Sequence, residues 1–247
     1  MGYHVVEKEE NMLMVVFLSC SKPEPPQCED EENYACFRGA FRTLLGAPVE
    51  DMELCTPDLP DVPCVRTAED GTWNIPGLPK ESNVWVTAEH PDFVPTVFPQ
   101  HTDYDWYEWY KVALPSWIMD ENAKNLDLEV DSSKGHLIFL VWEGMNIDGD
   151  DTPLVQGVTA TLAPASENLF YANLFNLADS NMTETGASGS GGAVNLEPGS
   201  IDLRLEAPAG RCAGHSFSYA FHDDNSIPVP IVEGYTTAVD VLCPVEP

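Results

Sequence analysis

Residues 67–75 read Thr-Ala-Glu-Asp-Gly-Thr-Trp-Asn-Ile, and a looser version of this stretch, Thr-Gly-Ala-Ser-Gly, returns at residues 185–189. The same order of features surrounds both copies: a Pro turn, an alternating strand, a Thr before a Gly turn, a short strand, a Pro/Gly turn and a second alternating strand. The first copy lies within residues 38–98. A repeat of this size predicts two similar domains in place of one large fold.

The strands of each copy alternate apolar and polar residues. Residues 201–205 place Ile, Leu and Leu on one face and Asp and Arg on the other, and residues 84–88 and 158–162 repeat this period of two. The pair Asp70-Gly71 is suited to the positive φ of a tight hairpin. Short half-buried strands between turns predict an all-β chain built from antiparallel sandwiches.

This order of strands and turns resembles the carboxypeptidase-regulatory-like domain, a prealbumin (transthyretin)-like Greek-key sandwich. In the first copy the matching positions are Gly39, Gly46, Pro48, Thr67, Asp70, Gly71, Trp73, Leu78, Pro79 and His90 to Pro95. In the second copy, Gly189 to Gly192 stand where Asp-Gly is expected. The tandem arrangement and its cysteines resemble secreted proteins and lipoproteins of myxobacteria and their relatives. The resemblance implies a fold and little about function, because such modules serve many unrelated hosts.

The resemblance and the repeat together imply two tandem Greek-key prealbumin-like β-sandwiches joined by a short helical linker. The expected segments are a signal segment at 1–19, an acidic Pro-rich tether at 20–34, a first sandwich at 35–114, a linker at 115–133 and a second sandwich at 134–247.

Four local elements are predicted within these segments. The first strand is expected at 40–45, and the linker contains a helix over 116–125 that is capped by Ser116. Residues 136–142 are apolar enough to form a central strand buried on both faces. Residues 178–193 are mostly Ser, Gly, Thr and Asn, which predicts a flexible surface loop.

The N-terminal residues predict export. Residues 12–18 form the only continuous apolar run near this end, and the following Ser19-Cys20 completes a stretch that resembles a bacterial lipobox with Cys20 as the acylated residue. The leader departs from the usual pattern in Phe17 and in its acidic residues, which a misplaced start codon explains. We expect a protein of the bacterial cell envelope, either an outer-membrane lipoprotein or secreted, that meets the membrane only through its lipid anchor.

The chain is strongly acidic, with 41 Asp and Glu against 11 Lys and Arg and a formal net charge of −30. This balance excludes nucleic acid and anionic membrane surfaces as partners, because both attract cationic side chains. Two explanations stay open. The acidity serves solubility, or life in a salty medium, or it serves the binding of cations.

Seven cysteines leave one over if all the others pair, and Cys20 is the natural odd one. Three local disulfides are predicted, namely Cys28–Cys36, Cys55–Cys64 and Cys212–Cys243. The alternative partners of Cys36 are Cys55 and Cys64, across the sheet. A structural zinc site is not favoured, because spacings of eight and nine residues without a Cys-x-x-Cys knuckle do not fit one.

Two stretches are candidates for ligand binding. Tyr104, Trp106 and Trp109 lie among carboxylates, as in a sugar-binding face, although packing in the core or between domains is the alternative. Asp148, Asp150 and Asp151 resemble the start of a calcium loop. No EF-hand Glu follows at the required position and strands are expected on both sides, so the stretch is either an acidic hairpin loop or a weak calcium site.

The sequence lacks the familiar catalytic motifs. Its six histidines form no His-Glu-x-x-His or other paired-ligand spacing, and no Gly-x-Ser-x-Gly elbow is present. We therefore predict a non-catalytic exported cell-envelope lipoprotein without a cofactor, in a structural or binding role toward a cell-surface glycan or an envelope protein. The alternatives are a carbohydrate-binding module that uses the aromatic run 104–110 and an enzyme whose site is assembled from distant residues.

Overall fold

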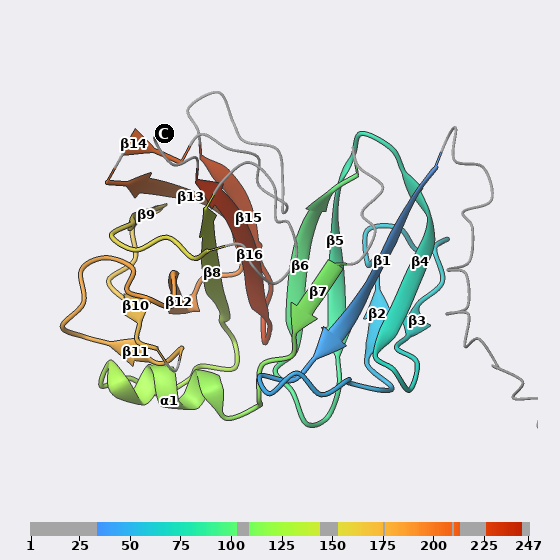
Figure 1. The fold of residues 1–247 in the computed structure, drawn as a ribbon, viewed down its shortest axis with the longest axis horizontal. Coiled ribbons are helices and arrows are strands. Elements are labelled where there is room, and N and C mark those ends of the chain that lie inside the picture. Colours follow the sequence, from blue (N-terminus) through green and yellow to red (C-terminus); the bar gives the residue numbers. More distant parts are fainter. Residues whose placement is uncertain are drawn as a thin grey trace, which may run out of the picture.

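The alternating strands form an all-β structure whose two halves lie side by side, with one short helix beneath the second half (Figure 1). The computed structural model describes residues 34–102, 109–143, 153–174, 176–208, 210–212 and 226–243. The prediction of an all-β chain is confirmed.

The first half of the chain contains β1 (Tyr34–Arg42), β2 (Glu53–Cys55), β3 (Val65–Arg66), β4 (Thr72–Pro79), β5 (Asn83–Glu89), β6 (Thr96–His101) and β7 (Trp109–Val112). Helix α1 (Ile118–Asn125) follows. The second half contains β8 (Gly135–Glu143), β9 (Thr159–Ala163), β10 (Leu169–Ala172), β11 (Ala178–Asp179), β12 (Ser190–Leu196), β13 (Gly199–Ala207), β14 (Gly210–Arg211), β15 (Ile227–Ile231) and β16 (Thr236–Cys243).

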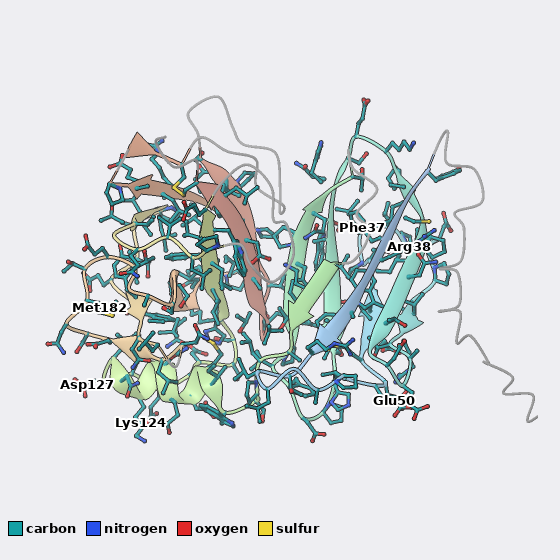
Figure 2. The ribbon with its side chains drawn as sticks, in the orientation of Figure 1. Phe37, Arg38, Glu50, Lys124, Asp127 and Met182 are labelled. Carbon is teal, nitrogen blue, oxygen red and sulfur yellow. A yellow bond between two sulfur atoms is a disulfide. The ribbon has the colours of Figure 1, made fainter. Side chains whose placement is uncertain are left out.

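Each half packs two sheets face to face over its own apolar core. In the first half the sheet β4-β1-β7 covers the strands β6-β5-β2-β3, and in the second half β11-β10-β12-β8-β16 covers β9, β13, β14 and β15. Figure 2 labels Phe37 and Arg38 at neighbouring positions of β1. Phe37 is buried in the first core, whereas Arg38 is half-buried on the other face of the strand, as alternation requires.

The two predicted copies are equivalent in their hydrogen bonds. The Thr67 hydroxyl donates to the carbonyl of Val49 at 2.7 Å and accepts from the amide of Met52, three residues after Val49, at 2.9 Å. The Thr185 hydroxyl donates to the carbonyl of Val155 at 2.8 Å and accepts from the amide of Val158, three residues after Val155, at 3.0 Å. The internal repeat is therefore confirmed at its two threonines.

The Gly turn after each threonine is equivalent as well. Gly71 has φ of 79° and Gly189 has φ of 57°, and each donates its amide to the carbonyl three residues before it. The carbonyl of Gly71 accepts from the amide of Phe41 in β1, and the carbonyl of Gly189 accepts from the amide of Val141 in β8, both at 2.9 Å. A side chain at residue 71 would lie 2.5 Å from the Phe41 carbonyl, so the turn requires glycine there.

One sheet of nine strands crosses both halves, in the order β11-β10-β12-β8-β16-β6-β5-β2-β3. The crossing point is β16, which pairs in parallel with β8 along its whole length and with the start of β6 at two positions. The predicted domain boundaries at 35–114 and 134–247 stay a prediction, but the two halves are not separate sheets connected only by a linker.

The first strand and the helix differ from the predictions. Strand β1 runs over Tyr34–Arg42, and not over 40–45, because Ala35 and Phe37 already contribute to the first core. The predicted cap on Ser116 is wrong, since α1 begins at Ile118 with Trp117 at the cap position and no side-chain hydrogen bond there.

Helix α1 is docked, and not a free connection. Its residues Ile118 and Met119 are buried in a third apolar cluster together with Phe170 and Val194, which lie on the outer face of the second half. Val94 from the first half belongs to the same cluster. The helix therefore covers one face of the second half, within a cluster that also includes a residue of the first half.

The predicted flexible loop at 178–193 is also wrong in part. Residues from Ser190 onward form β12, which pairs with β10 and β8 inside the sheet. A side chain at Gly192 would lie 2.2 Å from the carbonyl of Leu137 and 2.8 Å from the Phe170 ring. Glycine leaves room in this strand for a neighbouring backbone and an aromatic ring. The same glycines give the stretch the composition of a loop, so composition alone predicted the wrong structure.

The predicted central strand at 136–142 is confirmed as β8, which lies between β12 and β16. Leu137, Phe139 and Val141 point into the second core, while Ile138 packs against the outer cluster.

Candidate functional site

Two of the three predicted disulfides are confirmed. Cys55 bonds to Cys64 and Cys212 bonds to Cys243, with S–S distances of 2.01 and 1.98 Å. Cys36 is also disulfide-bonded, and its partner lies outside the described residues. Its alternative pairing with Cys55 or Cys64 is wrong, because those two sulfurs bond to each other.

Most of the other predicted site residues, for lipidation, a disulfide, sugar binding and calcium binding, lie outside the described residues. These are Cys20, Cys28, Tyr104, Trp106, Asp148, Asp150 and Asp151. The backbone of Trp109 is described, and it pairs with Gly39 at the start of the edge strand β7. Lipidation, sugar binding and calcium binding at these positions therefore stay predictions.

No group of three or more His, Cys, Asp or Glu side chains is placed to hold a metal ion within the described ranges. In the same part of the chain, no helix has the length and apolar character of a membrane span.

The best-defined polar site is the junction between the halves, and strand β16 builds it. Because side chains alternate along a strand, Val239, Val241 and Cys243 point into the second core. Ala238 points the other way and packs against the first core. Asp240 lies on this second face, so the sequence of β16 places a carboxylate where the two halves meet.

Asp240 forms a buried ion pair with Lys111 of β7. The two side chains are only 14% and 6% exposed, and the Lys111 ammonium also lies 5.0 Å from the centre of the Phe98 ring. The second carboxylate oxygen of Asp240 accepts a hydrogen bond of 3.0 Å from the Trp142 indole. Burial lowers the pKa of the Lys111 ammonium, and the Asp240 carboxylate opposes this shift.

Two further polar contacts lie at the start of β16. The amide of Thr236 donates to the carbonyl of Pro95 at 2.9 Å, which continues the sheet into the first half. The Tyr235 hydroxyl donates to the carboxylate of Glu89 in β5. Burial and the nearby Glu89 carboxylate raise the pKa of Tyr235 to about 12.

These polar contacts join the two halves of the chain. Charges that are paired and buried between strands are poorly accessible to a substrate. Three contacts each join a residue of the first half to one of the second, namely Lys111 with Asp240, Pro95 with Thr236 and Glu89 with Tyr235. Lys111 and Asp240 were not predicted, because 129 residues separate them. The available signal was a single carboxylate within the otherwise apolar run Ala238-Val-Asp-Val-Leu-Cys243.

No protein-family model matches the sequence, and no curated protein matches it. Among solved structures, the chain is similar to the minor pilin GBS52 of Streptococcus agalactiae at 16% identity and a TM-score of 0.28, over 86% of this chain and 97% of that one. It is similar to the Bacillus anthracis TIE protein at 10% identity and a TM-score of 0.27, over 87% of this chain and 34% of that one. It is similar to a D295N mutant of the shaft pilin SpaA of Lactobacillus rhamnosus GG at 8% identity and a TM-score of 0.26, over 87% of this chain and 100% of that one.

TM-scores below 0.5 do not establish a common fold.

Proposed function

We propose that the protein is a non-catalytic structural element of a bacterial cell envelope, in which two carboxypeptidase-regulatory-like sandwiches form one rigid spacer. Lipid on Cys20 holds the spacer to the membrane through the acidic tether at 20–34. The partner at its far end is an envelope protein or a cell-surface glycan.

The observation that carries the proposal is the junction. A chain of two sandwiches joined only by a linker bends freely, and relative motion is the default for domains with a small polar interface. Here a shared sheet, a buried ion pair and the docked helix α1 all connect the halves. A spacer needs such rigidity, whereas an enzyme with a cleft between domains needs motion.

The cysteines support export. All five cysteines within the described residues are disulfide-bonded. Disulfides persist in oxidising compartments such as the periplasm and the cell surface, and they are rare in the cytosol. The equivalence of Thr67 and Thr185 supports two units of one type, as the resemblance to tandem sandwiches implies.

Metabolic labelling with a palmitate analogue tests the proposal. The chain is expressed in a Gram-negative host and isolated from the envelope fraction. We expect label in the wild type and in Ser21→Ala, a matched control one residue away, and none in Cys20→Ala. Label that persists in Cys20→Ala, or its absence from all three proteins, contradicts the lipoprotein assignment.

A further inference from the structure

We infer that the protein bears tension along its chain, and that the paired parallel strands β8 and β16 form the clamp that resists it. The inference rests on the proposed function, because a spacer held at one end and attached to a partner at the other is pulled through its two ends.

The geometry of the clamp follows from strand direction. Strands β8 and β16 run parallel and pair at eight positions, from His136 with Thr236 to Glu143 with Cys243. Tension from the N-terminal side pulls β8 at its Gly135 end. Tension from the C-terminal side pulls β16 at its Cys243 end. The two neighbouring strands are therefore pulled in opposite directions along their common axis.

Such a pull places the ladder in shear. The hydrogen bonds of a parallel ladder are evenly spaced along the strands, so sliding one strand past the other strains all of them together. If both strands were pulled from the same end, the bonds would break one after another. The clamp thus resists a pull through the chain ends far better than a pull that peels the strands apart.

The first half repeats the device on a smaller scale. Strands β1 and β7 are also parallel, and they pair at four positions from Gly39 with Trp109 to Arg42 with Val112. Tension enters β1 at its N-terminal end and leaves β7 at its C-terminal end, so this ladder is sheared as well. With half as many pairs, we expect the ladder of the first half to yield before the clamp.

The junction supports the clamp from the side. Strand β16 is also paired with β6, and its Asp240 is held by Lys111 in the first half. Sliding β16 out of the sheet therefore requires the loss of the buried ion pair in addition to the ladder.

The disulfide Cys212–Cys243 provides a covalent path for force that bypasses the chain between the two cysteines. Cys243 is the last position of the clamp, and its bond to Cys212 closes a loop with a sequence separation of 31. Tension that arrives at Cys243 is shared between β16 and Cys212, and the chain between the two cysteines cannot be extended while the bond is intact. The loop therefore hides about 110 Å of chain, at roughly 3.5 Å per residue, from a pull.

Single-molecule force spectroscopy on the full chain tests the inference. In the first arrangement, handles are attached ahead of residue 34 and after residue 243. In the second, they are attached at residue 143 and after residue 243, which pulls β8 and β16 from the same end. We expect a severalfold lower rupture force for the second half in the second arrangement. Equal rupture forces in the two arrangements overturn the clamp.

A disulfide comparison provides the second readout. In the first arrangement, complete unfolding of a Cys212→Ser/Cys243→Ser variant should release about 110 Å more chain than the wild type, at roughly 3.5 Å per residue. A matched Cys55→Ser/Cys64→Ser variant, with a separation of nine, should release only about 30 Å more. An unchanged released length in the first variant contradicts the covalent path. If that variant fails to fold, the two pulling arrangements on the wild type still decide the clamp.

These outcomes are independent of the lipid label. A high rupture force in an unlabelled protein supports the clamp and contradicts the lipoprotein assignment. Equal rupture forces in a labelled protein overturn the clamp alone.

Discussion

Removing the carboxylate of Asp240 should destabilise the protein more than any exposed ion pair does. In Asp240→Ala the Lys111 ammonium stays behind with 6% of its side chain exposed, and the Trp142 indole loses its acceptor. Breaking a buried pair by removing one partner costs about 3–5 kcal/mol, because an uncompensated charge remains. We expect a loss of unfolding free energy of at least about 3 kcal/mol on the same basis.

The control is the partly exposed pair of Lys134 with Glu197, whose side chains are 24% and 80% exposed. Lys134→Met should cost no more than about 1 kcal/mol, because an ion pair with a solvent-exposed partner contributes little. The double variant Lys111→Met/Asp240→Leu removes both charges and should recover most of the loss, since a well-packed apolar pair often replaces a buried ion pair without cost.

Urea unfolding followed by tryptophan fluorescence and circular dichroism measures these free energies. The wild type, the single variants Lys111→Met and Asp240→Leu and their double variant form a double-mutant cycle, with Asp240→Ala measured beside it and Lys134→Met as the control. If Asp240→Ala loses no more stability than Lys134→Met, the ion pair does not stabilise the junction and the reasoning is refuted.

Three further predictions concern other contacts. In urea unfolding, Gly192→Ala should lower the free energy of unfolding by about 3 kcal/mol or more, because the added Cβ lies 2.2 Å from a backbone carbonyl and overpacks the sheet. Gly77→Ala is the control: it has open space and a φ of 76°, so it should cost only about 1–2 kcal/mol of backbone strain. Burial lowers the pKa of His136, so the unfolded chain binds more protons than the folded protein below about pH 6.5, and the free energy of unfolding falls as the pH falls. The stability advantage of the wild type over His136→Gln should therefore shrink as the pH is lowered from 7.5 to 5.5, and a constant difference contradicts this. The pKa of Tyr235 is raised to about 12, so the folded protein keeps a proton that the unfolded chain loses above about pH 10. The stability advantage of the wild type over Tyr235→Phe should therefore shrink as the pH is raised from 10 to 12, and an advantage that grows over this range contradicts the prediction.

Local periodicity predicted much of the fold. The strands around Val84, Ile201 and Leu137 were predictable because each buries one face of alternating or continuous apolar residues. The repeat was predictable because Thr67 and Thr185 perform the same task, which is to bond through the side-chain hydroxyl to a segment between earlier strands. The disulfide Cys55–Cys64 was predictable because its cysteines enclose one Pro-rich loop, and Cys212–Cys243 because its cysteines bracket the final strands.

The remainder depends on contacts between distant residues. Composition could not reveal that Gly192 lies in a strand, because the reason is a ring contributed by Phe170. The ion pair of Lys111 with Asp240 joins residues from the two halves, and neither is unusual in its own neighbourhood except as a charge in an apolar strand. The junction therefore depends on the pairing of β16 with β6, which no local sequence pattern specifies.

The central claim is that the two halves form one rigid body through the pairing of β16 with β6. Residual dipolar couplings of backbone amides test it most directly, because they report the orientation of each half in solution. We predict that couplings from residues 34–102 and from residues 135–143 and 226–243 fit a single alignment tensor. Two tensors of different magnitude or orientation would show that the halves move independently, and the account of a rigid spacer would be wrong.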